Sequence, residues 1–542
     1  MARRCASRLT AFLVAAGMLI TLGACSSSGS TVTKTPPASS PLGSVAVFLP
    51  SDGLTISQHT PLNKWTKFTP TLTKSLENRG FSRGSINVTT SDSFDKQSRS
   101  IQDYVVNTLA ITDNKAKTKA PASGGSSSSG ATQHAASNAT LIVAPVVQLG
   151  DADTQYGDYA SHSVTWDAAG GKSGGDDSTG TSGKSSADDS AATLRQAGDR
   201  LVSALKLARE SGVHVIVLSN PIQGFTPDVF VQMSTAEQIG SLQAKLLASK
   251  LQLDKVSRDN PKSIEVLLPR AAAQDGADNA DSADSAAKDG SQDDFAAEAF
   301  VGIWKVLGPY VAAGKVVSPS GSFNAKTTQK DWQASAFDAS KPQQVKDELA
   351  RRLGMEQKKT PHTRIDGIIA MNDFVASSAI DELDSLQYTG SAADVNPAIT
   401  ISGVLDNIAG KKDLLRGSVP DPAKQPAAND TTTTPENTEK NNFRWPIVTG
   451  YGAYIDTIPQ VVNGRLWMTG LEDRQLMAAN IAQACEQLDR SQDIGKLPFI
   501  ALANVNGAQV PTIQGQPLAV SASNLKKTLI DPGYITLAEA GL

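Results

Sequence analysis

Short apolar runs alternate with longer amphipathic segments along most of the chain. Ser44–Pro50 reads SVAVFLP, which has the length and composition of a buried strand. After it, Trp65, Phe68, Leu72 and Leu76 recur every three or four residues, which predicts a helix with one apolar face. A strand followed by a helix is the unit of α/β folds, in which consecutive strands lie parallel.

The alternation continues through two successive series. The first predicts strands at 85–90, 139–147 and 213–219 and helices at 94–109 and 191–212. The second predicts helices at 237–251, 295–314 and 341–354 and strands at 263–269, 315–318 and 365–373. We therefore expect an α/β fold of two lobes, each a parallel sheet flanked by helices. In such folds a ligand binds at the carboxyl ends of the strands.

Four internal stretches that are poor in apolar residues interrupt this alternation. They run over about 114–138, 169–189, 272–293 and 420–442, and they are rich in Ser, Gly, Ala, Asp, Thr or Pro. Segments of this kind cannot bury enough apolar surface to offset the entropy lost on ordering. We therefore expect long disordered insertions at the surface, where added loop length costs little.

The N-terminal residues have the pattern of an export signal. Arg3, Arg4 and Arg8 precede an apolar run over 9–22, and a basic start with a short apolar middle is typical of a secretory signal. The sequence LGAC that ends at Cys25 resembles the bacterial lipobox, whose cysteine is lipidated. This implies a signal peptide over 1–24, a tether over 25–43 and a lipid anchor on the outer face of the bacterial cell membrane. The alternative is an ordinary signal peptide cleaved elsewhere.

Charge and cysteine content exclude several classes of function. A formal net charge of -4 argues against a nucleic-acid partner. Because Cys5 leaves with the signal and Cys25 carries the lipid, Cys485 has no intramolecular partner. The five histidines show no metal-ligand spacing, and no nucleophile elbow is present. We expect no cofactor, no metal and no enzyme activity, and we interpret Glu472 and Asp473 as acids at the start of a helix.

Several segments resemble one family, the multiple-monosaccharide binding proteins of ABC importers, which have the type I periplasmic-binding-protein fold. The matching segments are FLPSDG with NKWTKF, FVGIWKVLGPYVAAGKVV, and above all WPIVTGYGAYIDTIPQVVNGRLWMTGLEDRQLMAANIAQA over 445–484. Their order covers essentially the whole mature chain once the insertions are set aside. The resemblance implies a small-molecule ligand, with carbohydrate favoured, an ABC permease as partner, and a monomer.

The same resemblance implies a division into lobes. One lobe spans 44–232 plus about 469–508, the other spans 233–468 plus about 509–520, and a tail over 521–542 packs near the hinge. We expect chain crossings between the lobes near 230–234, 468–471 and 505–511.

The family's sugar site is only partly present in this chain. Such a site needs charged, planar hydrogen-bonding groups and a ring against the sugar. Lys64 stands where the family has Arg, Ser219 and Asn220 replace an Asp-Arg pair, and Asn372 and Asp373 match the family's Asn-Asp pair. The ligand-binding candidates are Lys64, Trp65, Ser219, Asn220, Trp332, Asn372, Asp373, Tyr451 and Tyr454, with Tyr451 the first choice.

Each candidate also has a structural explanation. Trp65 could be the apolar face of a helix, Asn372 with Asp373 a helix cap, and Asn220 a turn before Pro221. The tyrosines and Trp332 could stack on a ligand or cover the cleft. Two functions therefore stay open. One is a carrier that closes on a solute by hinge bending, and the other is a sensor or interaction lipoprotein on the same fold with a divergent site.

Overall fold

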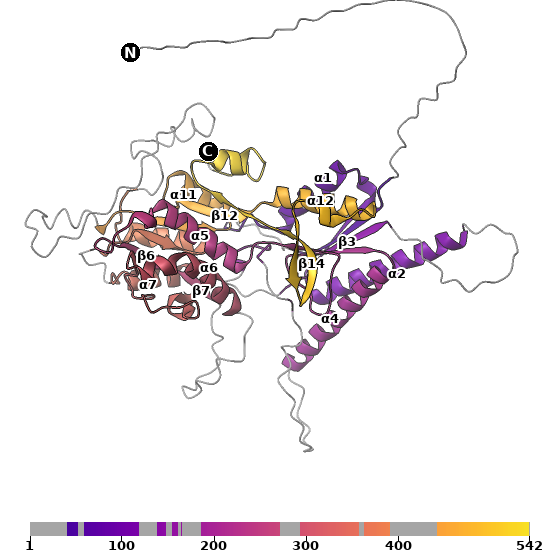
Figure 1. Ribbon diagram of the computed structural model, residues 1–542, viewed down its shortest axis with the longest axis horizontal. Helices are drawn as coiled ribbons and strands as arrows, with labels where there is room; N and C mark the ends of the chain where they lie inside the picture. The colour runs from indigo at the N-terminus through magenta and orange to yellow at the C-terminus, as the bar shows by residue number, and fades with distance from the viewer. Residues whose placement is uncertain are drawn as a thin grey trace, which may run out of the picture. The chain divides into compact units, whose positions relative to one another are not determined.

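Two β-sheets organise the part of the chain that the structure describes, and the predicted α/β class with two helix-flanked sheets is confirmed (Figure 1). The computed structural model describes residues 41–51, 59–118, 138–147, 154–160, 164, 186–270, 293–356, 362–390 and 442–540. The predicted signal peptide, the lipid site at Cys25 and most of the four predicted insertions lie outside these ranges. The helices that flank two insertions reach further than expected, since α2 continues to Thr118 and α4 begins at Ser186.

The first sheet has seven strands in the order β13-β14-β5-β4-β3-β1-β2. Their bounds are β1 Ser44–Pro50, β2 Ile86–Ser91, β3 Ala139–Val143, β4 His214–Leu218, β5 Val229–Gln232, β13 Ile500–Val505 and β14 Ala508–Gln514. All neighbours pair in parallel except β13, which forms an antiparallel hairpin with β14. We call this sheet with its helices the seven-stranded lobe.

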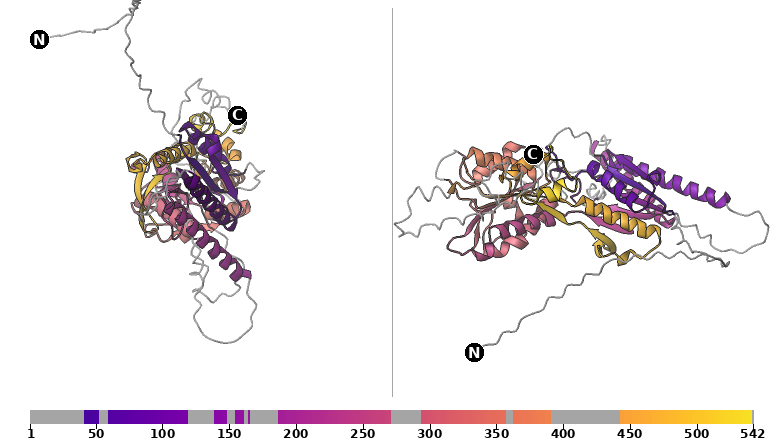
Figure 2. Two further views of the ribbon diagram at one scale, coloured as in Figure 1. Left: turned by 90° about the vertical axis from the view of Figure 1, so that its right-hand side faces the viewer. Right: turned by 90° about the horizontal axis from the view of Figure 1, so that it is seen from above.

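Both faces of this sheet are buried, because its strands present apolar side chains alternately to each side. In β1, Val45 and Leu49 belong to one hydrophobic cluster and Ala46 and Phe48 to another. Helices α1 (Trp65–Asn78) and α12 (Arg474–Asp489) contribute to the first cluster. Helices α2 (Phe94–Thr118) and α4 (Ser186–Glu210) contribute to the second, and they run side by side (Figures 1 and 2).

The second sheet has six strands in the order β15-β12-β11-β10-β6-β8 and forms the six-stranded lobe. Its strands are β6 Lys262–Val266, β8 Val316–Val317, β10 Gly367–Ile369, β11 Ile447–Tyr451, β12 Met468–Glu472 and β15 Pro517–Val520, and β7 Leu268–Arg270 pairs separately with β9 Ala336–Asp338. Its helices are α5 Ala236–Lys250, α6 Asp293–Ala312, α7 Pro342–Arg352, α8 Asp373–Ser385 and α11 Ile458–Val462.

Helix α6 is the one helix of the described ranges that is long and apolar enough, over Phe295–Ala312, to span a membrane by length and composition. Here it packs closely against α5. A Cβ added to Gly240 would lie 2.2 Å from the carbonyl oxygen of Ala299, and one added to Gly302 would lie 2.0 Å from that of Glu237. These two glycines therefore allow the backbones of α5 and α6 to approach, as in a core helix pair.

Within the residues that the structure describes, the chain crosses between the two lobes at three places. The first crossing joins β5 to α5 through 233–235, and the second joins β12 to α12 at Asp473. The third joins β14 to β15 at 515–516, so the expected position at 505–511 is wrong: those residues form the β13–β14 hairpin of the seven-stranded sheet. Tyr534, in the C-terminal tail, packs near the second crossing, with its hydroxyl 3.0 Å from Asp473 Oδ1.

Candidate interlobe binding site

The first candidates, Lys64 and Trp65, lie at the start of α1 and contact a carboxylate of their own lobe. Lys64 Nζ is 2.8 Å from Asp158 Oδ1, and the backbone N–H of Trp65 donates to Asp158 Oδ2 at 3.0 Å. The Trp65 side chain is only 3% exposed, and its ring centroid lies 5.7 Å from Phe68 and 5.0 Å from Tyr159. Packing of the seven-stranded lobe therefore accounts for Trp65.

Ser219 and Asn220 follow β4 and are both buried. The backbone of Ser219 has φ +63, a value that L residues adopt mainly in tight turns, and its hydroxyl donates to the carbonyl of Tyr159 at 3.2 Å. Lys64, Trp65 and Ser219 therefore converge on two residues, Asp158 and Tyr159.

On the other lobe, Asn372 is the N-cap of α8, as the structural explanation predicted. Its Oδ1 accepts from the backbone N–H of Val375 at 2.9 Å. Its Nδ2 donates to Oε1 of Gln155 in the other lobe at 3.0 Å. The cap thus fixes the amide so that the NH₂ group faces the seven-stranded lobe.

Asp373, the first residue of α8, is fully buried and binds three donors. It accepts from Tyr454 N at 3.0 Å, from Thr457 Oγ1 at 2.9 Å and from Thr469 Oγ1 at 2.8 Å. Burial raises the pKa of Asp373 to about 6, and these donors act against that rise. Its oxygens link α8 to β12 and to the loop after β11, and so hold the six-stranded lobe together.

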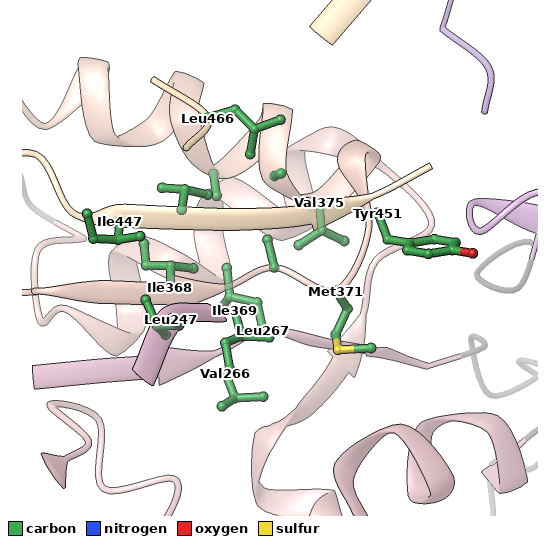
Figure 3. Close-up of a cluster of buried hydrophobic side chains, with 14 of the residues drawn as sticks. Leu247, Val266, Leu267, Ile368, Ile369, Met371, Val375, Ile447, Tyr451 and Leu466 are labelled. Carbon is green, nitrogen blue, oxygen red and sulfur yellow. The ribbon is translucent and has the colours of Figure 1, made fainter. Parts of the chain in front are cut away.

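Tyr451 and Tyr454 carry neutral phenols that reach the other lobe. Figure 3 shows the hydroxyl of Tyr451, at the end of β11, pointing beyond the aliphatic cluster of the six-stranded lobe. This hydroxyl accepts from Asn63 Nδ2 at 3.3 Å, while that of Tyr454 donates to the carbonyl of Gln155 at 2.7 Å. Burial raises the pKa of both tyrosines far above the ordinary value.

Trp332 belongs to a different environment. It begins a short 3₁₀ turn, Trp332–Ser335, is 9% exposed, and packs in the hydrophobic core of the six-stranded lobe. Packing alone accounts for this side chain.

One segment that sequence reasoning missed, 154–160, contacts both groups of candidates. Its Asp158 and Tyr159 belong to the seven-stranded lobe, and its Gln155 and Tyr156 reach the six-stranded lobe. Leu62 also bridges the lobes, because its N–H donates to the carbonyl of Gly452 at 2.8 Å. The place expected for a ligand is thus filled by protein side chains.

A glycine shapes this segment. Gly157 has φ +89, and a Cβ there would lie 2.7 Å from both the carbonyl oxygen and the Cβ of Asn63. Its N–H closes a turn onto the carbonyl of Thr154 at 3.2 Å. The sequence signal that could have revealed the segment is TQYGDYA, which holds two tyrosines around a glycine in a stretch otherwise poor in large apolar residues.

Glu472 lies where the three crossings meet. Its Oε2 accepts from the N–H and hydroxyl of Ser234 at 2.9 and 2.5 Å, and its own N–H donates to Asn63 Oδ1 at 3.1 Å. Its Oε1 has no hydrogen-bond partner among the described residues, and a Cβ on Gly515 would come within 2.3 Å of it. Burial raises the pKa of Glu472 to about 7.

Of the two acids that sequence reasoning placed at the start of a helix, only Asp473 is there. Its side chain caps α12 by accepting from Leu476 N at 3.0 Å, whereas Glu472 is the buried last residue of β12. Within the described ranges no group of three or more His, Cys, Asp or Glu could hold a metal ion. The interlobe residues offer hydrogen-bonding groups and rings, which suit the binding of a polar molecule.

Two surface hollows of the seven-stranded lobe have a different lining. One, of about 420 Å³, is lined by Ser51, Thr90, Ser91, Asp92, Lys96, Arg99 and Ser100. The other, of about 580 Å³, is lined by residues of 206–214 and 224–228. Neither lining includes a ligand-binding candidate.

Comparisons with known proteins find structural neighbours only. No protein-family model matches the chain, and no curated protein matches it significantly. The chain is similar to a solute-binding protein of an ABC transporter from Clostridium phytofermentans with bound β-D-glucose: 15% identity, 92% of this chain and 99% of the other covered, TM-score 0.46.

Two further solved structures are similar to the chain at comparable identity. A carbohydrate transporter solute-binding protein from Chloroflexus aurantiacus, in complex with D-glucose, is 16% identical over 91% of this chain and 97% of the other, with TM-score 0.46. The Caulobacter myo-inositol binding protein is 14% identical over 91% and 97%, with TM-score 0.37. At such identities the ligand of this chain has to be inferred from its own residues.

Proposed function

We propose that this chain is a membrane-anchored, extracytoplasmic solute-binding protein that holds a small molecule between its two lobes for delivery to an ABC permease. A sugar or sugar-like compound is the ligand class that the sequence resemblance implies. The lipid anchor would be at Cys25, and the lobes would open and close by bending at the three crossings.

One observation carries this proposal: candidates from both lobes converge on the same place. Lys64, Trp65 and Ser219 contact Asp158 or Tyr159, while Asn372 and Tyr454 contact Gln155. All the contacted residues lie within 154–160. Directional hydrogen bonds from two lobes onto one short segment are the arrangement expected where opening and closing control access to a ligand.

A second function, that of a sensor or interaction lipoprotein, is supported by the residues that lie between the two groups of candidates. Gln155 and Tyr156 of the chain itself fill the space between the candidates. When the hydrogen-bonding groups at the lobe interface are already paired with groups of the chain itself, no solute is required to pair with them. Such a protein would act through a protein partner instead.

A thermal-shift screen separates the two functions. The chain from Cys25 onward, carrying Cys25→Ser, is heated with monosaccharides, oligosaccharides, polyols, nucleosides and amino acids. A ligand at 100 times its dissociation constant adds about 2.7 kcal/mol to the free energy of unfolding. The carrier function predicts a shift with one class that is reduced in Tyr454→Phe and kept in Tyr388→Phe, whose hydroxyl donates to Thr363 O within the six-stranded lobe. Cooperative unfolding without any shift would favour the sensor or interaction function.

A further inference from the structure

We propose that the six-stranded lobe carries a subsite for a primary carboxamide next to an aromatic ring, and that Gln155 and Tyr156 occupy it as an internal ligand. The external ligand of this class is a peptide or peptide-like compound in which glutamine precedes an aromatic residue. The inference rests on the carrier function proposed above, and it names a peptide-like ligand for the interlobe site in place of the sugar that the sequence resemblance implies.

Three directional hydrogen bonds define the subsite, and all of them go to Gln155. Its Nε2 donates to the carbonyl of Ala339 at 3.0 Å, and its Oε1 accepts from Asn372 Nδ2 at 3.0 Å. Its backbone carbonyl accepts from the hydroxyl of Tyr454 at 2.7 Å. Ala339 and Asn372 are 0% exposed and Tyr454 is 2% exposed, so groups of one lobe that are hidden from water depend on a single residue of the other lobe.

The two side-chain bonds favour a primary carboxamide over a carboxylate or an ammonium group. The carbonyl of Ala339 can only accept a hydrogen bond. Asn372 Oδ1 is committed to the N–H of Val375 in the helix cap, so its Nδ2 must be the group that faces the subsite. A carboxylate would place an oxygen against the Ala339 carbonyl, and an ammonium would face the Asn372 amide NH₂. A primary carboxamide carries a donor and an acceptor on one carbon and so satisfies both partners at once.

The aromatic part of the subsite follows directly along the segment. The ring centroid of Tyr156 lies 4.6 Å from that of Phe295 on α6, with an interplanar angle of 46°. A second ring, Tyr451, lies 6.5 Å away on the same lobe. Centroid separations in this range stabilise aromatic pairs. The six-stranded lobe therefore binds the side chains of two consecutive residues, an amide and a ring.

The internal ligand is fixed to the opposite lobe, so lobe opening would withdraw it. Asp158 accepts from Lys64 and Trp65, and the hydroxyl of Tyr159 donates to the carbonyl of Lys64 at 2.6 Å. Bending at the three crossings would carry Gln155 away with the seven-stranded lobe and uncover the subsite. Because a tethered group competes at a high effective concentration, removing its side chain should strengthen binding of an external ligand.

The test uses a matched pair of ligands on the chain from Cys25 onward with Cys25→Ser. N-acetyl-glutaminyl-tyrosine N-methylamide and its glutamyl counterpart are titrated by calorimetry into this protein with and without Gln155→Ala. We expect the glutaminyl ligand to bind the Gln155→Ala protein at least about tenfold more tightly than it binds the unsubstituted protein. We also expect the Gln155→Ala protein to bind the glutaminyl ligand about tenfold more tightly than the glutamyl ligand. If Gln155→Ala fails to fold, Gln155→Asn, whose amide is one methylene too short, replaces it.

Two variants serve as controls. Gln97→Ala removes a different buried glutamine, whose Nε2 donates to Ala144 O at 2.8 Å within the seven-stranded lobe, and it should not gain affinity. Asn372→Asp keeps an acceptor for the α8 cap but removes the subsite donor, and should abolish binding in the Gln155→Ala background.

D-glucose and myo-inositol are titrated in parallel, so that the two proposals can fail separately. Binding of the glutaminyl ligand to Gln155→Ala with loss in Asn372→Asp supports the carboxamide subsite. Sugar binding without glutaminyl binding overturns the subsite and leaves the proposed function standing. If a cooperatively folded Gln155→Ala protein binds neither class, the carboxamide subsite is overturned, and the carrier function is then decided by the broader thermal-shift screen.

Discussion

The buried carboxyl of Glu472 predicts an unusual dependence of stability on pH. Its Oε2 binds Ser234, its Oε1 has no hydrogen-bond partner among the described residues, and the carboxyl lies at the meeting point of the three crossings. Asp473 beside it and the neutral phenol of Tyr451 are the titratable groups that face it. The perturbation is Glu472→Gln, which keeps the shape and an oxygen for Ser234 but cannot ionise.

The sign and size of the pH dependence of the free energy of unfolding follow from the raised pKa of Glu472. Burial moves the pKa of Glu472 from 4.5 to about 7, so near pH 6 the folded protein keeps a proton that the unfolded chain has lost. The free energy of unfolding therefore falls as pH rises from about 4.5 to about 7, by about 3 kcal/mol in total for roughly 2.5 pKa units, and changes little above that range. The raised pKa of Asp373 acts in the same direction at lower pH and is shared by both proteins, so it cancels in the comparison.

Urea unfolding followed by tryptophan fluorescence between about pH 5 and pH 8 measures this difference. We expect Glu472→Gln to match the unsubstituted protein near pH 5 and to exceed it by about 1–3 kcal/mol at pH 8. Glu77→Gln, which alters a partly exposed carboxyl of α1 paired with Arg83, is the control and should leave the profile unchanged. Parallel profiles for Glu472→Gln and the unsubstituted protein would refute a buried carboxyl that titrates near neutrality.

Three further predictions concern single sites. Trp65→Ala should lower the free energy of unfolding by about 3–5 kcal/mol, measured in urea, because the ring is core; a loss below about 1 kcal/mol would contradict this. Gly515→Ala should cost about 1–3 kcal/mol by pressing on Glu472, whereas Gly84→Ala, with no neighbour within 4 Å, should cost little; equal thermal stability of the two would refute the contact. Cys25→Ser should move the exported chain from the membrane fraction to the soluble fraction, and unchanged fractionation would exclude lipid anchoring.

The local pattern of apolar and polar residues was sufficient to predict most of the helices and strands. Strand β1 has the predicted bounds Ser44–Pro50, and α1 buries Trp65, Phe68, Leu72 and Leu76 as their spacing indicated. The predictions agree with the structure because the periodic burial of apolar side chains depends on each strand or helix and the one face that it buries. The third crossing was misplaced because strands β13 and β14 could not be assigned to a sheet without their long-range partner, β5.

The candidate site was predicted less completely. Asn372 and Asp373 follow strand β10; Asn372 contacts Gln155 of the other lobe, and Asp373 contacts the loop after β11. Trp65 and Trp332 proved to be core, because an aromatic in an amphipathic pattern does not reveal what covers it. The segment with Gln155 was missed, because its partners Ala339, Asn372 and Tyr454 lie far away in the sequence.

The sequence by itself determined the α/β class, the two series of strands and helices, and which side chains have the chemistry to bind a polar ligand. Tertiary structure alone decided how those side chains are used. Hydrogen bonds and burial of Glu472, Asp373 and Gln155 depend on residues up to hundreds of positions away, and periodicity carries no information about such pairs. The same alternation of apolar and polar positions would fit an open cleft as well as one filled by the chain's own 154–160 segment.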